Sequence, residues 1–353
     1  MREDAEGFLM PFADASACVN CGICERTCPA AEAHPRDGSP TCFAAKSTDA
    51  ELVRASSSGG LFSEFALKVL AAQGVVYGAA VVGPNLDVRH IRVDCADGLA
   101  ALRGSKYAHS ETGTVFRSVR EDLKTHPVLF TGTPCQIAGL RAFLAKEDPN
   151  LLTVEVICHG TPPDRLYRDL KREMAERHGR LTAISFRDKA EGWTSRAITG
   201  WYATGRKIRE RGELNDYFRA FIAHLTLRRS CEDCRFNDGR SGADITLGDF
   251  WGVETVLPEL ADDTGVSAVI LHTERGRAAF AGLDCHKYRV ALADIAMSNP
   301  SYQAPRVADP HRDAFLAMTT RVGIHAACRK YCPLMRQTLL RRVIGKLKRM
   351  LMR

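Results

Sequence analysis

The feature of this sequence that most constrains its fold is a set of cysteines far apart along the chain. The set comprises Cys135, Cys158, Cys231 and Cys234. Cys135 and Cys158 each come where an apolar, strand-like run gives way to a turn, and ligands of open α/β sheets collect at that edge. With the Cys231-x2-Cys234 pair they supply the four thiolates that one 4Fe-4S cluster needs. The pattern predicts a redox site that is assembled by folding.

Other interpretations of these cysteines stay open. A CxxC pair is half of a metal site, a redox dithiol, or a coincidence. Cys231 and Cys234 follow an apolar and aromatic helix predicted over 217–227, and the residues around them favour a loop, whereas a thioredoxin-like dithiol would open a helix. Cys135 precedes a predicted helix, which lowers a thiol pKa and suits ligation or nucleophilic attack. His159 is a candidate proton donor to a substrate, or a structural histidine beside a ligand.

Composition fits a soluble globular protein. The 353 residues are 45% hydrophobic and 26% charged, enough for one large core or two smaller ones. No apolar run reaches the roughly 18 residues of a membrane span, and the first residues lack a secretory signal, so we expect a cytoplasmic protein. In that reducing compartment, the 13 cysteines with their short spacings favour thiolate ligation of metal over disulfides.

The net charge of +7 is concentrated at the C-terminal end. The stretch 339–353 predicts a basic amphipathic helix that lies on an anionic membrane surface or a partner, or is a solvated helix with one packed face. Upstream of it stands a Cys328-x3-Cys332 pair without an assigned role. No basic stripe with aromatic residues indicates nucleic-acid binding.

The most specific short motif lies near the N-terminus. It is the ferredoxin-type run Cys18-x2-Cys21-x2-Cys24-x3-Cys28-Pro29, typical of a 4Fe-4S site. In two-cluster ferredoxins the fourth cysteine serves the other cluster, but here no partner run precedes it. Either Cys28 or Cys42 therefore closes the site, with Cys28 preferred, and a zinc knuckle or free thiols are the alternative. We expect residues 1–45 to form this small segment.

Three stretches are candidates for binding a cofactor, and the first two are polar. The first, Ser56-Ser57-Ser58-Gly59-Gly60, leads into an amphipathic helix, where a phosphate would meet the positive end of the helix dipole, although such a sequence is more often a helix cap. The second, Gly104-Ser105-Lys106-Tyr107, combines a cation, an aromatic ring and a hydroxyl, which suits a diphosphate and a planar ring or a plain surface loop. A third, Asp249-Phe250-Trp251, would stack on a flavin or pack in the core.

As a set, these motifs resemble the coenzyme F420 hydrogenase/dehydrogenase beta-subunit family, whose relatives include 7-hydroxymethyl chlorophyll a reductase. The resemblance covers about residues 6–300 and depends on SSSGG, GSKY, GTPCQIAGL, ICHG, SCEDC and DITLGDFWG. It implies an α/β (α+β) fold with a mixed-sheet core that binds FAD over residues 46–300, after a ferredoxin-like segment and before a helical tail over 301–353. It also implies a 4Fe-4S cluster on Cys135, Cys158, Cys231 and Cys234.

The resemblance further implies a function in which hydride and single electrons are exchanged between FAD, one or two 4Fe-4S clusters and a partner. The expected site residues near the flavin are Ser57, Ser58, Gly59, Gly60, Gly104, Ser105, Lys106, Tyr107, Asp249, Phe250 and Trp251. Lys106 would stabilise negative charge on the reduced ring. The partner would be a ferredoxin or a deazaflavin coenzyme. The alternatives are a ferredoxin-dependent reductase of a small or sugar-linked substrate, and an electron-transfer subunit without a substrate site.

Overall fold

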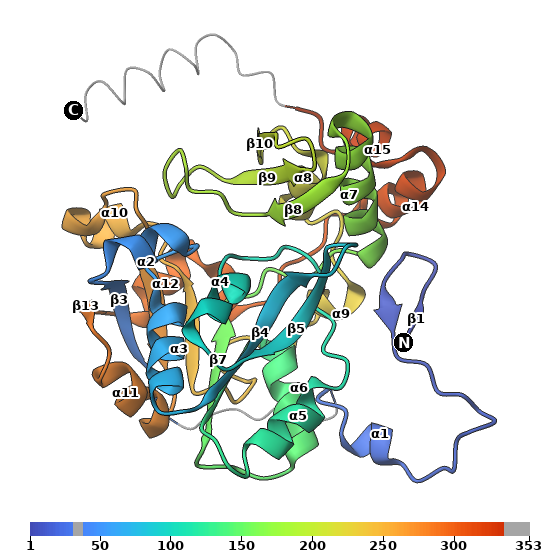
Figure 1. The fold of residues 1–353 in the computed structure, drawn as a ribbon. Coiled ribbons are helices and arrows are strands. Elements are labelled where there is room, and N and C mark those ends of the chain that lie inside the picture. Colours follow the sequence, from blue (N-terminus) through green and yellow to red (C-terminus); the bar gives the residue numbers. More distant parts are fainter. Residues whose placement is uncertain (31–37, 335–353) are drawn as a thin grey trace.

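The larger part of the molecule is an eight-stranded mixed sheet, with strand order β13-β3-β12-β11-β7-β6-β4-β5 (Figure 1). The structure, a computed structural model, describes residues 1–30 and 38–334. The strands are β3 (Thr41–Ser47), β4 (Val75–Val82), β5 (Asp87–Val93), β6 (Val128–Gly132), β7 (Leu151–Val156), β11 (Ile245–Asp249), β12 (Ser267–Leu271) and β13 (Cys285–Val290). The expected α/β class with a mixed sheet is confirmed.

The centre of the sheet is parallel. Strands β4, β6, β7 and β11 pair in parallel, while β5, β12, β3 and β13 add antiparallel edges. The parallel strands are apolar and largely buried, as expected when helices cover both faces of a sheet. Because their carboxyl ends meet at one edge, the loops after β6, β7 and β11 open side by side.

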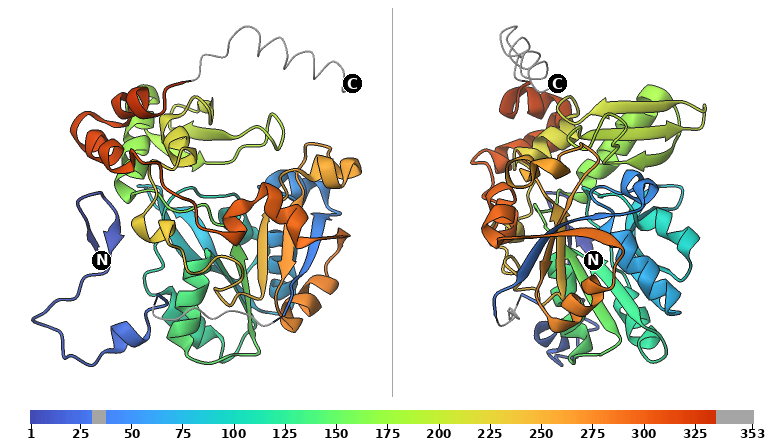
Figure 2. Two further views of the ribbon diagram at one scale, coloured as in Figure 1. Left: turned by 180° about the vertical axis from the view of Figure 1, so that it is seen from behind. Right: turned by 90° about the vertical axis from the view of Figure 1, so that its left-hand side faces the viewer.

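Helices lie on both faces of this sheet (Figures 1 and 2). They are α2 (Ala50–Ala55), α3 (Leu61–Ala71), α4 (Leu99–Leu102), α5 (Val115–Asp122), α6 (Pro134–Leu144), α9 (Arg229–Glu232), α10 (Val253–Val256), α11 (Glu274–Ala281), α12 (Leu292–Ser298) and α13 (Pro300–Gln303), with 3-10 turns at Ala96–Gly98 and Pro258–Leu260. The apolar face of α3 packs on the sheet through Leu61, Phe65 and Ala66, all fully buried. Burial of such faces supplies most of a helix's stability in a protein.

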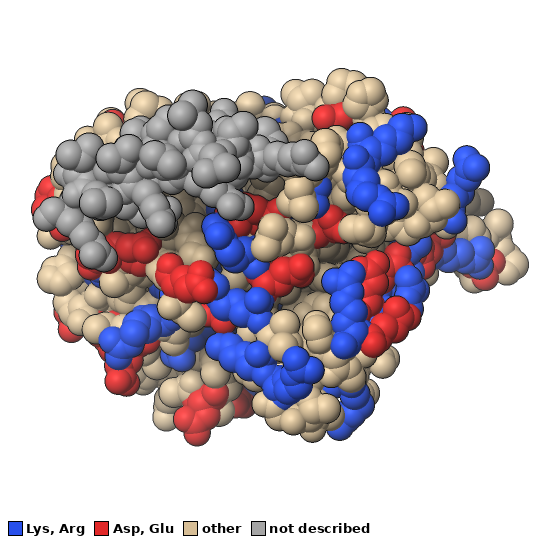
Figure 3. All heavy atoms as spheres, turned by 90° about the horizontal axis from the view of Figure 1, so that it is seen from above, with Lys and Arg blue, Asp and Glu red and all other residues tan. Residues whose placement is uncertain are grey.

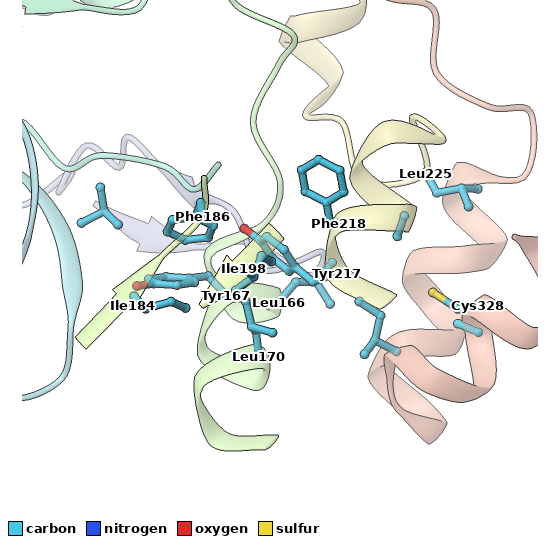
Figure 4. Packing of buried hydrophobic residues seen from close by; sticks show 14 of the residues in the cluster. Leu166, Tyr167, Leu170, Ile184, Phe186, Ile198, Tyr217, Phe218, Leu225 and Cys328 are labelled. Carbon is cyan, nitrogen blue, oxygen red and sulfur yellow. The ribbon is translucent and has the colours of Figure 1, made fainter. Parts of the chain in front are cut away.

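A smaller lobe stands above the sheet in Figure 1. It consists of the antiparallel strands β8 (Leu181–Ser185), β9 (Ala197–Tyr202) and β10 (Lys207–Arg211) with α7 (Asp164–His178), α8 (Asp216–Ile222), α14 (Arg312–Val322) and α15 (Ile324–Tyr331). Its core brings together side chains from α7, β8, β9, α8 and α15, including Leu166, Phe186 and Tyr217 (Figure 4). Seen from above, Lys and Arg side chains lie among Asp and Glu side chains on its described surface (Figure 3).

The N-terminal segment contains a two-stranded hairpin, β1 (Arg2–Glu3) and β2 (Leu9–Met10), followed by α1 (Ile23–Arg26). The hairpin is attached to the smaller lobe, because the buried Arg312 guanidinium donates to Glu6 Oε1 at 2.9 Å and Phe8 joins the lobe's core. The main sheet begins with β3 at Thr41, so the division expected at residue 45 lies inside a strand. The domain boundaries otherwise stay predictions.

Of the two helices predicted over 217–227 and 339–353, only the first lies within the described residues. The helix predicted over 217–227 is shorter, because α8 ends at Ile222 and His224 adopts a left-handed φ of 60° that turns the chain. That turn lets Leu225 and Leu227 reach the core from an irregular segment. The basic helix predicted over 339–353 lies outside the described residues. Among the residues that are described, none of the helices is both long enough and apolar enough to span a bilayer.

Candidate functional site

The carboxyl edge of the parallel strands carries the first two cysteines. Cys135 lies in the first turn of α6, whose N-cap Thr133 forms a capping box with Gln136. The Thr133 hydroxyl lies 3.2 Å from the Cys135 sulfur, which is exposed. Cys158 follows the end of β7, the next parallel strand in the sheet. The prediction that both cysteines lie at this edge is confirmed, and Cys135 stands at the beginning of a helix as expected.

Cys231 and Cys234 lie near these two cysteines, and the four together are called the core cysteines below. Burial raises the pKa of the Cys158 thiol well above its usual range, and the charges of Cys135, Cys231 and Cys234 raise it further. Burial also raises the pKa of Cys231 to about 11, with a contribution from the other thiols. An isolated thiolate is costly in such a place, whereas thiolates bound to a metal cluster share their charge with the cations. The site therefore suits ligands better than free thiols.

Gly160 permits this convergence. Its φ of 126° lies in the region that favours glycine, and a Cβ there would come within 2.6 Å of Leu227 Cδ2 and 3.5 Å of the Cys231 Cβ. The loop after β7 can thus pack directly against the segment that carries the CxxC pair. Cys231 lies in the single-turn helix α9, and Cys234 follows it. The loop predicted around the pair is confirmed for Asp233 and for residues 235–239, and is wrong for Glu232, the last residue of α9.

The donor set fits an iron-sulfur cluster in kind, since four thiols from three segments lie near enough to affect one another's charge. In residues 1–30 and 38–334, however, no three His, Cys, Asp or Glu side chains are arranged to hold a metal ion as they stand. This applies to the core cysteines and to Cys18, Cys21, Cys24 and Cys28, which are all exposed. Both ligand sets accordingly stay predictions.

The end of the N-terminal run contacts segments that carry two of these cysteines. Arg235, next to Cys234, donates to the Ala30 carbonyl at 2.9 Å. The Pro29 ring lies 3.8 Å from the position of a Cβ on Gly139 of α6, the helix whose first turn contains Cys135. Cys42, by contrast, is buried in β3 between β12 and β13, which leaves Cys28 as the proposed fourth ligand of the N-terminal site.

The two polar stretches meet. The Ser57 hydroxyl accepts from the Ser105 backbone N–H at 2.8 Å and lies 3.1 Å from the Ser105 hydroxyl. Ser58 donates to the Val266 carbonyl at 2.7 Å. Close packing accounts for Gly59, where a Cβ would lie 2.5 Å from the Ala45 carbonyl oxygen. The sequence thus identified residues that lie together in the fold. Their small side chains are explained by close packing as well as they would be by a bound ligand.

Gly60 and Gly104 differ in what surrounds them. Gly60 is the N-cap of α3 with a φ of 90°, and a Cβ there would lie 2.6 Å from Leu52. Gly104 has a φ of 82° and nothing within 4 Å of a Cβ position. Both need glycine for their backbone conformation, and Gly104 also leaves open space beside the Ser105 hydroxyl.

Lys106 is held by the backbone of the helix before it. Its ammonium donates to the carbonyls of Ala101, Leu102 and Arg103 at 3.2, 2.9 and 2.8 Å, at the C-terminal end of α4. Burial lowers the pKa of Lys106 to about 7. The residue is therefore a helix cap whose charge is easily changed by a nearby ligand.

A buried arginine that sequence reasoning missed joins three of the predicted residues. Arg187 forms an ion pair with Asp249 Oδ2 at 3.2 Å and donates to the Tyr107 hydroxyl at 3.3 Å. Its guanidinium carbon lies 4.9 Å from the centre of the Trp251 ring, which stacks on Trp193 with a centroid distance of 4.6 Å. The Arg187 side chain is 1% exposed. The Ser185-Phe186-Arg187-Asp188-Lys189 stretch gave no strong signal because its role depends on distant partners.

Comparison with family models decides the relationship. Two models described as coenzyme F420 hydrogenase/dehydrogenase, beta subunit, match the chain: the one for the N-terminal part matches residues 42–117, and the one for the C-terminal part matches residues 125–294. Together they cover more than half of the chain. This chain belongs to the coenzyme F420 hydrogenase/dehydrogenase beta-subunit family. It is accordingly a redox protein of the oxidoreductase and electron-transfer type, as the resemblance of its motifs implied.

Other comparisons add little to the family membership. A solved chain of the xenon-derivatised F420-reducing NiFe hydrogenase complex from Methanosarcina barkeri is similar at 15% identity, with a TM-score of 0.49, covering 84% of this chain and 91% of that one. No curated protein matches the sequence.

Two further predicted residues of this family member are packed among other side chains. Phe250 is fully buried in the cluster with Trp193 and Val266, so the interpretation as core packing describes it. His159 lies between Phe221 and His224, with ring centroids at 4.8 and 4.7 Å. Burial lowers the pKa of His159 to about 4, so the ring is neutral near pH 7. Its role in proton transfer stays a prediction.

Glu155 of β7 gives a pH-dependent stability that can be measured. It is buried, accepts from Ser241 and from Thr246 at 2.7 Å, and burial raises its pKa from 4.5 to about 7. Between these values the unfolded chain has lost this proton and the folded chain keeps it, so stability falls as pH rises, by at most about 1.4 kcal/mol per pH unit. We expect Glu155→Gln to remove this decline in urea unfolding between about pH 5 and about pH 7. Parallel pH profiles for the two proteins would contradict the assignment.

Proposed function

We propose that this chain is an iron-sulfur flavoprotein oxidoreductase that exchanges hydride and single electrons with a partner. The observation that carries the proposal is the convergence of Cys135, Cys158, Cys231 and Cys234 from separate segments at one sheet edge. Family membership supports the redox character. Bound FAD would accept a two-electron hydride, and 4Fe-4S clusters would carry electrons singly.

The four core thiols would hold one cluster. Cys135 and Cys158 come from the ends of regular secondary structure, and the CxxC pair would supply the other two ligands. The half-buried position of Cys158 would limit access of water on that side. The N-terminal run would hold the second cluster, and the contacts of Pro29 and Ala30 with α6 and Arg235 would keep the two sites close enough for electron transfer.

The flavin would be held by the paired Ser57 and Ser105 together with Arg187, which contacts the nearby Tyr107. Ser57, Ser105 and the backbone around Gly104 would supply donors and space for phosphate. Arg187 orients Asp249 and Tyr107, and the stacked Trp193 and Trp251 offer an aromatic wall beside them. The buried Nε of Arg187 has no hydrogen-bond partner within the described residues, which leaves one donor for a ligand.

Anaerobic purification with iron, sulfide and flavin analysis tests the proposal. We expect about eight irons and one FAD per chain, corresponding to two clusters. A preparation reconstituted with iron and sulfide that still lacks both iron and flavin would contradict it. Spectra of the reduced protein would then assign the flavin and the clusters separately.

The Lys106→Met variant tests the expected role of this cation. Loss of a positive charge near a flavin destabilises the reduced, anionic ring, so we expect a lower flavin reduction potential and slower turnover. Lys287→Met is the matched control, because the Lys287 ammonium also donates to backbone carbonyls at the end of a helix. These are the carbonyls of Ala281, the last residue of α11, and of Leu283 just after it. A potential that is equal in Lys106→Met and in the control would show that Lys106 is only a helix cap.

A second candidate is an electron-transfer subunit without its own substrate site. The family descriptions name a beta subunit, which favours a partner that carries the substrate. Turnover by the isolated chain with an artificial electron donor separates an enzyme from a subunit. Comparing reduced deazaflavin with reduced ferredoxin as electron donors then separates two enzyme hypotheses. One is an oxidoreductase that uses a deazaflavin coenzyme, and the other is a ferredoxin-dependent reductase of a small or sugar-linked substrate.

A further inference from the structure

Cys328 and Cys332 form a thiol pair that the proposed function does not use. Cys328 lies in the last turn of α15, and Cys332 is the residue that ends this helix, with its N–H bonded to the Cys328 carbonyl at 3.0 Å. Residues four apart lie on the same face of a helix. The pair belongs to the smaller lobe and is separate from the cysteines of both proposed clusters.

The two thiols are in direct contact and differ in exposure. Their side chains are hydrogen-bonded to each other, and the Cys328 thiol also donates to the Asp216 carbonyl at 3.5 Å. Cys328 is fully buried in the lobe's core, where Figure 4 shows it facing the aromatic and aliphatic side chains of α7 and α8. Cys332 is only half-buried. One thiol is therefore accessible and the other is protected behind it.

Cys328 and Arg219 of α8 together make the accessible thiol the more acidic one. The Arg219 guanidinium donates to the Cys332 carbonyl and bonds to Asp216 at 2.7 Å. The hydrogen bond from Cys328 lowers the pKa of Cys332, and the Arg219 charge lowers it further. The same hydrogen bond raises the pKa of Cys328. An accessible thiol of lowered pKa beside a protected second thiol is the arrangement of reactive dithiols.

A cavity lies beside the pair, lined by the residue after Cys332 but by neither cysteine. It has a volume of about 500 Å³ and lies between α7, α8 and α15. Its lining includes Arg219, Arg329 and Pro333, the residue after Cys332, together with the carboxylates of Glu173 and Asp216. Charges of both signs suit a zwitterionic molecule of low molecular weight.

We propose that Cys328 and Cys332 are a redox-active dithiol that is oxidised to a disulfide by a small zwitterionic disulfide. The Cys332 thiolate attacks one sulfur of the reactant, forming a mixed disulfide and releasing one thiolate. Cys328 then loses its proton to solvent and attacks the Cys332 sulfur, releasing the second. Two protein thiols are oxidised and one disulfide is reduced to two thiols.

Closing the bond requires a local adjustment that the position of Cys332 allows. Side chains four apart on a helix have Cβ atoms about 5–6 Å apart, whereas a disulfide needs about 3.5–4.5 Å. Cys332 has a φ of −137° and a ψ of 63°, outside the helical region, so it can move without breaking the bonds inside α15. Its movement would change the contact of Arg219 with the Cys332 carbonyl.

Peptide mapping of the full chain tests the proposal. Oxidised glutathione is the probe, added anaerobically to the purified protein with its cofactors, and free thiols are blocked before digestion. Trypsin cleaves after Arg329 and Lys330, so Cys328 and Cys332 end up on different peptides and their disulfide joins the two. We expect this joined pair to appear with glutathione and to disappear after reduction.

Three variants make the outcome decisive. Cys328→Ala should leave a stable glutathione adduct on Cys332, Cys332→Ala should leave Cys328 unmodified, and Arg219→Gln should slow the reaction severalfold because the thiolate loses its cation. Cys95, an exposed thiol elsewhere, is the internal reference for nonspecific reaction. Separate adducts on both cysteines, a bond from Cys332 to another cysteine, or reaction no faster than Cys95 would overturn the proposal. Iron and flavin content, which report the proposed function, should be equal in all variants.

Discussion

Replacement of Cys158 by serine is expected to remove the core cluster and abolish turnover. The thiol is half-buried and lies near the other three core thiols, and a serine hydroxyl does not replace a bound thiolate. Iron and acid-labile sulfide should each fall by about four per chain, while the iron of the N-terminal run remains. Turnover with a supplied donor should be lost, because electrons can no longer pass through this edge of the sheet.

Cys95→Ser is the matched control for this experiment. Cys95 is an exposed cysteine that follows β5 and belongs to neither proposed ligand set. Its variant should keep full iron, sulfide and turnover. If Cys158→Ser retains the same iron content as Cys95→Ser, the core cysteines do not bind a cluster and the proposed function has no electron path at this site.

Replacement of Arg187 by methionine is expected to lower the free energy of unfolding by about 3–5 kcal/mol, the usual cost of breaking a buried ion pair. The guanidinium is 1% exposed and its partner Asp249 is 17% exposed, so the variant leaves a poorly solvated carboxylate. The same change removes the donor to Tyr107 and the cation over Trp251. Urea unfolding measures the loss of stability, and flavin content measures the effect on the proposed site.

Two further variants separate the ion pair from the other contacts of Arg187. Arg187→Met combined with Asp249→Asn should recover much of the stability, since no unpaired charge remains. Arg196→Met is the control for the aromatic contact, because its guanidinium lies at the same 4.9 Å from the centre of the Trp251 ring. Equal destabilisation in Arg187→Met and Arg196→Met would assign the effect to the ring contact instead of the ion pair.

Features that depend on a local residue pattern were predicted from the sequence, whereas a turn set by distant packing was not. The sequence predicted that Cys135 begins a helix and that Cys158 ends a strand, because a buried strand followed by a turn has a local pattern. It also selected Ser57 and Ser105, which contact each other although 48 residues separate them. It overestimated the helix after Tyr217, since the left-handed turn at His224 is set by packing of Leu225 and Leu227.

The kind of chemistry was determined by the sequence alone, since thiol spacing and a set of short motifs are properties of residue order and already indicated the family. Only the tertiary structure decided which side chains share a site. Arg187 joins Tyr107, Asp249 and Trp251 through contacts between segments that are 62–80 residues apart. Such partners follow from strand order and lobe packing, which depend on the total burial of many residues and leave no local pattern.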